Sequence, residues 1–542
     1  MKKILKTAII TIIFLSALTA AAYFLLTKSK GDENSFDSRV VDEQSDQHEE
    51  HMYKFDTDST AIELVRVGDE KNVLNFNQTG VFTKANSKTA RDRLDRLIKR
   101  MDADFEKPII AYNPFGTVPD SYYFYFVTPS NCMVRYTVAV PDEDIHDYIR
   151  YVNNGTDNNI TTEHEFLVTG LVPGVTNYIN LELVDENGAH REDKTYKVSL
   201  TSIGVPSDIS YVVGRSEEKL KSGLFFMMPK KDKNIYKYDN NGIMRGMLAT
   251  DSGHGKRIYC KSGQLVYQIS KNRVVRTDKL GMVTGAVSVS GVKDILDMSY
   301  DGYENVFTLA KDKKSYSLYL TSFESNKTKK IYSFDKGITP TSITEPSAGN
   351  LYVSTSAPAG IIRIDGLLSS KPRPGAVFGK KSDWKKTKLK KKVCDPGKKK
   401  KSSKEDDQAA SGEAVSEDKT EKPEAKAFVG WDMKDVTLYL IPEESNGSSD
   451  TLSFAVEKAG VTQTEKIRLS VKKPSLEIID EKPAETSGRV CVQYMGDHCS
   501  VVGCAQGSYE ERDDLFKTIR QYGFIREFDG VWKLDLKGFS NL

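Results

Sequence analysis

Two stretches decide the fold of this 542-residue chain: Pro108-Ile-Ile-Ala-Tyr-Asn-Pro-Phe-Gly-Thr117 and Glu163-His-Glu-Phe-Leu-Val-Thr-Gly-Leu-Val-Pro-Gly-Val-Thr-Asn-Tyr-Ile-Asn-Leu-Glu-Leu183. The first is an apolar run that ends in Asn-Pro-Phe-Gly, as is typical of a buried strand followed by a turn. The second reads as a strand, a Pro-Gly turn and a strand in which polar and apolar residues alternate. Similar alternation between Tyr122 and Leu200 predicts a compact β-sandwich of about seven strands over residues 76–204.

One amphipathic helix is expected directly before the sandwich, from Asn86 to Phe105. Its apolar stripe is formed by Leu94, Leu97, Ile98 and Met101, which recur at helical spacing. Asn86 or Ser87 is the expected N-cap, because Asn and Ser side chains accept hydrogen bonds from the first helical N–H groups.

Residues 208–542 change to short strand pairs joined by tight turns, many with Asp or Asn before Gly. These residue types supply the positive φ angles that tight hairpins need. The hairpins recur roughly every 40–50 residues, which predicts a C-terminal β-propeller of about six blades. The hairpin segments are 235–245, 274–283, 294–309, 361–366 and 524–534.

The segment 380–426 interrupts this pattern. It opens with a run of lysines that reaches Lys401 and then becomes acidic and rich in Ser, Ala and Glu. Such a composition is unsuited to a buried core, so a disordered charged insertion is expected. Its basic half either contacts anionic lipid or wall polymer or is simply solvated.

The N-terminus is typical of a signal-anchor. Lys2, Lys3 and Lys6 precede an apolar run of 20 residues, from Thr7 to Leu26, which is long enough to cross a bilayer. Residues 1–27 are therefore expected to form a transmembrane helix, and 28–75 a polar stalk. The basic flank predicts a single-pass protein of the cell membrane with its bulk outside the cytoplasm. Cleavage near Ala20-Ala21-Ala22 is the alternative.

Composition restricts the partners. A formal net charge of +2 gives no reason to expect nucleic acid, and 10% aromatic residues fit an all-β protein. The chain has six cysteines. Among Cys491, Cys499 and Cys504, two could form a disulfide in an oxidising exterior, or all three could stay free thiols. Their spacing fits no standard zinc site, so neither a metal nor another cofactor is expected.

With the Asn-Pro-Phe-Gly-Thr and Pro-Gly segments in place, the sandwich resembles the N-terminal domain of bacterial arylsulfate sulfotransferases that use no nucleotide donor. A fibronectin-like sandwich is the alternative interpretation of Gly170–Tyr178, because many sandwiches have a similar turn before a final strand. The propeller resembles the same family through Asp239-Asn-Asn-Gly-Ile-Met-Arg245, and through Gly360-Ile-Ile-Arg-Ile-Asp365 followed by Gly379 and Trp384.

The resemblance implies sulfuryl transfer from a phenolic sulfate to a phenol. In the family a histidine carries the sulfuryl group, while other histidines and an arginine hold its oxygens. The matching stretches here lack these residues: 337–342 and 428–433 contain no histidine, Val292-Lys293-Asp294 replaces a His-Asp pair, and Ser356 stands in the arginine's place.

Seven histidines are present, of which only His254 and His498 belong to the propeller. They are the weak candidates for a catalytic nucleophile, although each also fits an exposed turn histidine. Lys256 and Arg257, next to His254, are candidates for binding an oxyanion.

Three functions stay open. The favoured one is an outward-facing, membrane-anchored binding protein that is degenerate at the catalytic histidines, with a phenol or aryl sulfate as ligand. The second is an active arylsulfotransferase that works through a sulfohistidine. The third is a surface scaffold or adhesion protein.

Overall fold

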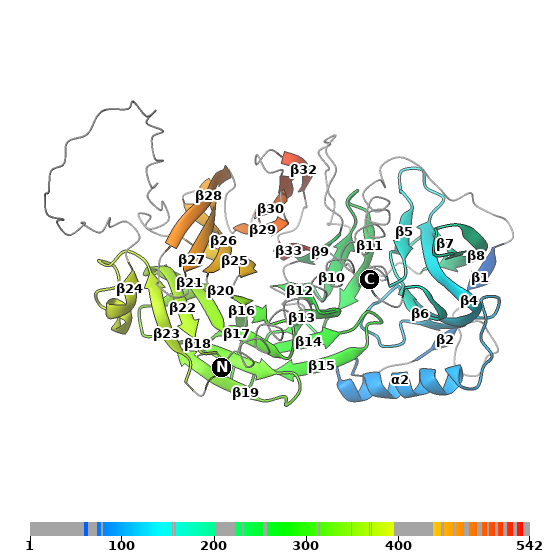
Figure 1. Ribbon diagram of the computed structural model, residues 1–542, viewed down its shortest axis with the longest axis horizontal. Helices are drawn as coiled ribbons and strands as arrows, with labels where there is room; N and C mark the ends of the chain where they lie inside the picture. The colour runs from blue at the N-terminus through cyan, green and yellow to red at the C-terminus, as the bar shows by residue number, and fades with distance from the viewer. Residues whose placement is uncertain are drawn as a thin grey trace, which may run out of the picture.

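The computed structural model describes residues 59–62, 73–76, 80–153, 156, 159–200, 223–229, 232–252, 257–312, 315–347, 349–367, 369 and 371–394, and the strands between 437 and 534. These parts are mostly β, which confirms the all-β prediction (Figure 1). In the part of the chain that the structure describes, no helix is long and apolar enough to cross a membrane. The predicted anchor and most of the predicted stalk lie outside it.

The N-terminal domain is one curved sheet that folds over a core. Its strands follow the order β1-β8-β7-β4-β3-β2, with β5 and β6 also paired to β4. The bounds are β1 Thr60–Ile62, β2 Leu74–Asn75, β3 Ile109–Tyr112, β4 Tyr122–Ala139, β5 Tyr148–Tyr151, β6 Thr161–Val168, β7 Thr176–Val184 and β8 His190–Ser199. The sheet thus begins before residue 76, because β1 and β2 lie in the segment 28–75 that the sequence predicts to be a stalk.

Strand β4 joins the two layers. The sequence predicts separate strands on either side of residues 128–132, but the structure has one strand of 18 residues. Its first half pairs with β3 and β6, and its second half with β5 and β7. Because the pairing to β6 is irregular between Val127 and Cys132, the strand bends there and passes from one layer to the other.

Helix α2 is shorter than expected, from Lys84 to Ile98, and its N-cap is Thr83. The Thr83 hydroxyl accepts from the Asn86 N–H at 3.2 Å, so Asn86 and Ser87 lie inside the first turn. Leu94 is fully buried, whereas Met101 lies beyond the helix and is 48% exposed.

Six further sheets follow in chain order, each with four or five strands among the described residues. Their strands are β9 Leu224–Pro229, β10 Asn234–Tyr238 and β11 Met244–Ala249 with β33 Phe528–Leu534; β12 Ile258–Lys261, β13 Gln264–Ser270, β14 Arg273–Thr277 and β15 Val283–Ser288; β16 Ile295–Tyr300, β17 Asn305–Lys311, β18 Tyr316–Ser322 and β19 Thr328–Ser333; β20 Thr339–Ser347, β21 Asn350–Ala357, β22 Ala359–Asp365, β23 Arg373–Phe378 and β24 Val393–Cys394; β25 Thr437–Ser445, β26 Ser449–Lys458, β27 Val461–Ser470 and β28 Leu476–Ala484; β29 Val490–Met495, β30 His498–Gly503, β31 Ser508–Arg512 and β32 Thr518–Gly523.

The six sheets contact one another in a closed order, each through one edge strand, and β12 is linked to β16 by the hydrogen bond from the Tyr259 hydroxyl to the Met298 carbonyl. Strand β16 packs on β20, β20 on β25, β25 on β29, and β29 on β33, which also contacts β12. Closure depends on β33, which pairs antiparallel with β9 and so joins the end of the chain to the first of the six sheets. The prediction of a local hairpin over 524–534 is therefore wrong: Asp529-Gly530 lies within β33, at an irregularity of its pairing with β9.

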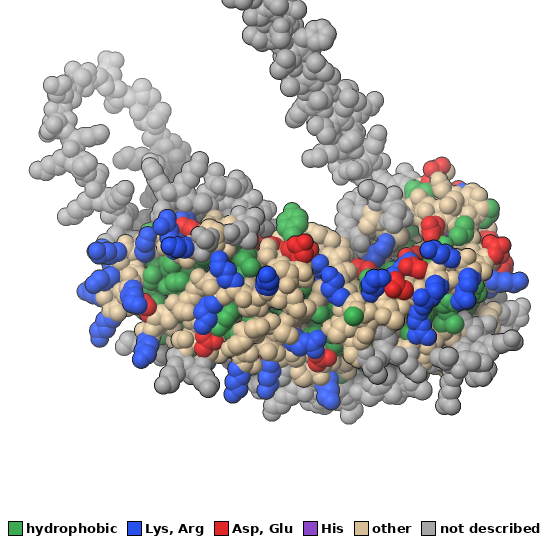
Figure 2. Space-filling model, turned by 90° about the horizontal axis from the view of Figure 1, so that it is seen from below, with side chains coloured by type: hydrophobic (Ala, Val, Ile, Leu, Met, Phe, Trp, Pro, Cys, Tyr) green, Lys and Arg blue, Asp and Glu red, His purple; other side chains and the backbone are tan. Residues whose placement is uncertain are grey.

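The first residues of the predicted disordered insertion are ordered in the structure. Residues 380–394 form turns, a 3-10 helix from Lys388 to Lys392 and the short strand β24. Trp384 and Leu389 are buried and fix this segment against β23, while the lysines around them point outward. Figure 2 shows basic side chains gathered at this end of the molecule. Residues 395–436 lie outside the described part.

The hydrophobic core is continuous from the sandwich into the first two of the six sheets. Two of the motifs noted in the sequence make this junction. The Asn-Pro-Phe-Gly-Thr turn is docked by Thr117, whose hydroxyl donates to the Gly281 carbonyl at 2.5 Å and whose carbonyl accepts from the Ala249 N–H at 2.9 Å. Arg245, the last residue of the Asp-x-x-Gly-x-x-Arg motif, reaches the carbonyls of His146 and Gly170.

The paired strands β29 and β30 limit the disulfide expected from the C-terminal cysteines. Cys491 lies opposite Val502, and Cys499 lies opposite Tyr494. The two cysteines are therefore three positions apart along the ladder, about 10 Å at the usual rise per residue. A disulfide needs Cα atoms closer than about 7 Å, so this register excludes the pair Cys491–Cys499.

Candidate functional site

A cluster of polar and charged side chains lies where the first strands β12, β16 and β20 meet. The strands are linked by hydrogen bonds from one sheet to the next. The Tyr259 hydroxyl donates to the Met298 carbonyl at 2.8 Å. The Ser299 hydroxyl accepts from the Glu345 N–H at 3.0 Å. Because β16 packs on β20 and Tyr259 of β12 is bonded to β16, the cluster lies at the junction of three sheets.

Arg257 and Asp297 form the core of this cluster. The guanidinium donates twice to the carboxylate, from Nε at 2.7 Å and from Nη2 at 3.0 Å. Both side chains are more than nine-tenths buried. Asp297 also accepts from the Ile343 N–H at 2.8 Å, so the arginine's charge is compensated within the fold.

Lys261 is the second cation of the cluster. Its ammonium donates to the Tyr300 carbonyl at 3.2 Å. Burial lowers the pKa of Lys261, while the nearby carboxylates of Glu345 and Asp301 act in the opposite direction. Burial also raises the pKa of the Tyr259 phenol, so Tyr259 stays a neutral hydrogen-bond donor near pH 7. The cluster thus combines a neutralised arginine, a partly buried lysine and neutral hydroxyls.

Arg257 is the one site residue predicted from the sequence whose side chain the structure describes. Lys256 and His254 lie outside the described residues. His498 begins β30, where the strand's pairing is described and its side chain is not. The structure therefore gives no test of these three candidates, and it places Arg257 in an ion pair that the sequence did not reveal.

The three described histidines all lie in the sandwich. His164 is buried beside Cys132 and Thr128, with its Nε2 at 3.5 Å from the thiol and 3.1 Å from the hydroxyl. This Cys-His contact has the residue types of a nucleophilic dyad, but its protonation does not fit that chemistry. Burial lowers the pKa of His164 to about 4 and raises the pKa of Cys132, so both are neutral at pH 7.

Ser356 and the matched segment around Gly360, Gly379 and Trp384 have structural contacts here. Ser356, in the arginine's place, donates to the Thr339 carbonyl at 3.4 Å. Trp384 packs on Gly360 and Gly379, where an added Cβ would lie 2.8 and 2.6 Å from its indole. The stretch 428–433 lies outside the described residues.

Comparison with known proteins supports the sandwich assignment. Residues 109–201 match the family of the arylsulfotransferase Ig-like domain, so the predicted resemblance to arylsulfate sulfotransferases is confirmed for this domain. The match begins at β3 and ends after β8. No curated protein matches the sequence.

Solved structures with similar arrangements are remote. They include a candidate 6-phosphogluconolactonase from Bacteroides uniformis (9% identity, 75% of this chain and 100% of that chain, TM-score 0.35). Others are a protein of unknown function from Bacteroides caccae (9%, 58% and 99%, TM-score 0.33) and TolB from Acinetobacter baumannii (10%, 65% and 77%, TM-score 0.30). At these TM-scores the likeness assigns neither fold nor function.

Proposed function

We propose that this chain is an extracytoplasmic, membrane-anchored relative of the arylsulfate sulfotransferases that binds an aryl sulfate or phenol but does not transfer the sulfuryl group. The six sheets are proposed to be the blades of a six-bladed propeller. Their closed order, their packing through edge strands and the pairing of β33 with β9 support this arrangement. The apolar run from Thr7 to Leu26 supports the anchor.

The Arg257–Asp297 pair is the observation that carries the loss of transfer chemistry. A sulfuryl group that is being transferred has negative charge on its oxygens, which fixed cationic donors must stabilise. The described arginine at the centre already donates to a buried carboxylate at 2.7 and 3.0 Å. Turning it toward a ligand would leave Asp297 as a buried carboxylate without its cation, which is strongly unfavourable.

Lys261 supports the binding half of the proposal. It is partly buried on β12, where burial lowers its pKa, and an anion bound nearby would favour its ammonium form. The phenol of Tyr259 adds an aromatic surface on the same strand. These groups fit a ligand with one anionic end and one ring.

The test combines binding and turnover on the full-length protein. Equilibrium binding of 4-methylumbelliferyl sulfate should be saturable and should weaken about tenfold in Lys261→Met, because one charged contact is lost. Lys330→Met is the matched control, since Lys330 is half-exposed on β19 and pairs with Asp312. Transfer from the same donor to 1-naphthol should stay at background. Robust transfer that His254→Ala or His498→Ala abolishes, with His190→Ala unaffected, would establish the active enzyme instead.

A further inference from the structure

A cavity lies in the sandwich, and it shares no residue with the cluster on β12, β16 and β20. It has a volume of about 330 Å³ and lies between the two ends of the curved sheet, where β1 and β2 are the terminal strands. Strands β3 and β8 complete its walls. The opening of a curved β-sheet is a common place for small-molecule pockets, and this volume lies at the lower end of their usual range.

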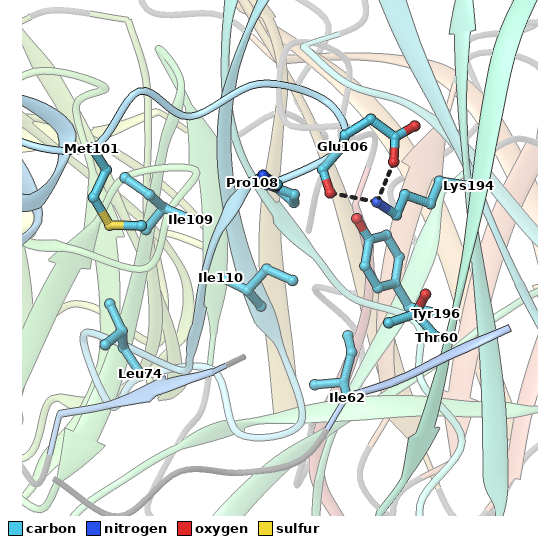
Figure 3. A pocket seen from close by; sticks show the side chains of 11 residues that line it. Thr60, Ile62, Leu74, Met101, Glu106, Pro108, Ile109, Ile110, Lys194 and Tyr196 are labelled. Atoms are coloured by element: carbon cyan, nitrogen blue, oxygen red, sulfur yellow. Dashed lines mark hydrogen bonds and ion pairs between the residues drawn. The ribbon is translucent and has the colours of Figure 1, made fainter. Parts of the chain in front are cut away.

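The floor and walls of the cavity are apolar. Ile62, Ile109 and Ile110 are each less than 8% exposed and line it from β1 and β3. Met101 closes one side and is 48% exposed (Figure 3). A thioether on an unbranched chain adapts to the shape of an occupant. These walls fit a ring-sized apolar body.

One polar group in this cavity has no partner. The Tyr196 side chain on β8 is 3% exposed, and its hydroxyl has no hydrogen-bond partner among the described residues. A buried hydroxyl without a partner is unfavourable, and such groups are rare in folded proteins. The Tyr196 hydroxyl points toward the end of the cavity at which the Lys194 ammonium lies (Figure 3). A ligand oxygen at that end would satisfy it.

Lys194 gives this end of the cavity its charge. Its ammonium donates to the Glu106 carboxylate at 2.9 Å and to the Glu106 carbonyl. An ammonium has three donors, so one remains for a further acceptor. The ammonium also lies 5.9 Å from the centre of the Tyr196 ring. The exposed Lys107 lines the same cavity, so the charged lining residues are two lysines, Lys194 and Lys107, and one carboxylate, Glu106.

We propose that this cavity is a binding site for a small aromatic carboxylate, or another ring-sized organic anion of the same shape. The ring lies against Ile62, Ile109 and Ile110. One anionic oxygen accepts from the Tyr196 hydroxyl and from the remaining donor of Lys194. The site is independent of the proposed function at the centre of the six sheets, since it shares no residue with it.

The test uses 4-fluorobenzoate and its neutral isostere 4-fluorobenzamide as probes, with ¹⁹F NMR titration of the full-length protein. Saturable binding of the benzoate is expected, with weaker binding of the benzamide. Tyr196→Phe should weaken benzoate binding about tenfold, as expected for one hydrogen bond to a charged acceptor. Lys194→Met should weaken the benzoate by a similar factor and leave the benzamide unchanged.

Stability separates a binding role from a structural one. Because the Tyr196 hydroxyl has no partner, Tyr196→Phe should leave the melting temperature unchanged or raise it. Tyr267→Phe is the matched control: its hydroxyl, on β13, is also buried without a hydrogen-bond partner among the residues that the structure describes. Tyr267→Phe should likewise leave the melting temperature unchanged or raise it, and it should leave benzoate binding intact. Absence of saturable binding, or binding that neither Tyr196→Phe nor Lys194→Met weakens, would overturn the proposal.

Discussion

Arg245 contributes both an ion pair and hydrogen bonds to the contact between the sandwich and the first of the six sheets, and its removal gives a quantitative prediction. The side chain is 1% exposed, and its Nε donates to the Asp239 carboxylate at 2.7 Å. Its other nitrogens donate to carbonyls of the sandwich, and the guanidinium lies 5.3 Å from the centre of the Tyr148 ring. Arg245→Ala therefore removes an ion pair and the contact between domains at once.

The expected loss in the free energy of unfolding depends on the contacts that Asp239 keeps in Arg245→Ala. Removing one partner of a buried ion pair typically costs about 3–5 kcal/mol, because the other charge is left without compensation. Asp239 keeps hydrogen bonds from the N–H groups of Asn241 and Ile243, both at 2.9 Å. These bonds stabilise the remaining carboxylate, which places the loss toward the lower end, about 3 kcal/mol.

Urea unfolding of the full-length protein would measure this loss. Arg273→Ala is the matched control, because Arg273 also reaches the N-terminal domain, at the Phe82 carbonyl, but pairs with Asp251 where both side chains are about one-third exposed. Exposed pairs contribute about 0–1 kcal/mol. The double variant Arg245→Met with Asp239→Asn should recover part of the loss, since it leaves no buried charge. An Arg245→Ala loss no larger than that of Arg273→Ala would refute the reasoning.

Two further predictions concern buried groups. Burial lowers the pKa of Lys237 to about 7 from 10.5, so the folded state binds fewer protons than the unfolded chain between these values and stability rises with pH there. Lys237→Met should flatten the rise in melting temperature between pH 7 and 10.5, and an unchanged profile would contradict the assignment. Trp384→Ala should lower the free energy of unfolding by about 3–5 kcal/mol, because the indole is fully buried. Lys386→Ala, exposed on the same segment, should have little effect, and equal losses would show that the segment is not anchored by Trp384.

The sequence predicts the local parts of this fold well. The hairpins around Asp239, Asp278 and Asp301 form where they were expected, because each Asp accepts from N–H groups two and four residues later. This information lies within a few residues of the turn. Local residue types also predict the Asn-Pro-Phe-Gly-Thr turn, but they do not predict that this turn docks the sandwich on the first sheets.

What the sequence does not predict depends on residues far apart in the chain. Strand β33 pairs with β9 across almost the whole C-terminal part, and the local sequence Asp529-Gly530 predicts a hairpin turn instead. Arg257 and Asp297 are 40 residues apart, and nothing local indicates their contact. The lysine-rich composition of 380–394 predicts disorder, but two buried side chains, Trp384 and Leu389, outweigh it.

The central claim is that the protein has lost sulfuryl transfer, and turnover tests it most directly. Transfer from 4-methylumbelliferyl sulfate to 1-naphthol should stay at the background rate in the wild-type protein, because its central arginine is held by Asp297 and the matched blade segments lack histidines. Losing a covalent nucleophile removes several orders of magnitude of rate. Turnover well above background that is abolished by His254→Ala or His498→Ala would contradict the claim and identify the nucleophile.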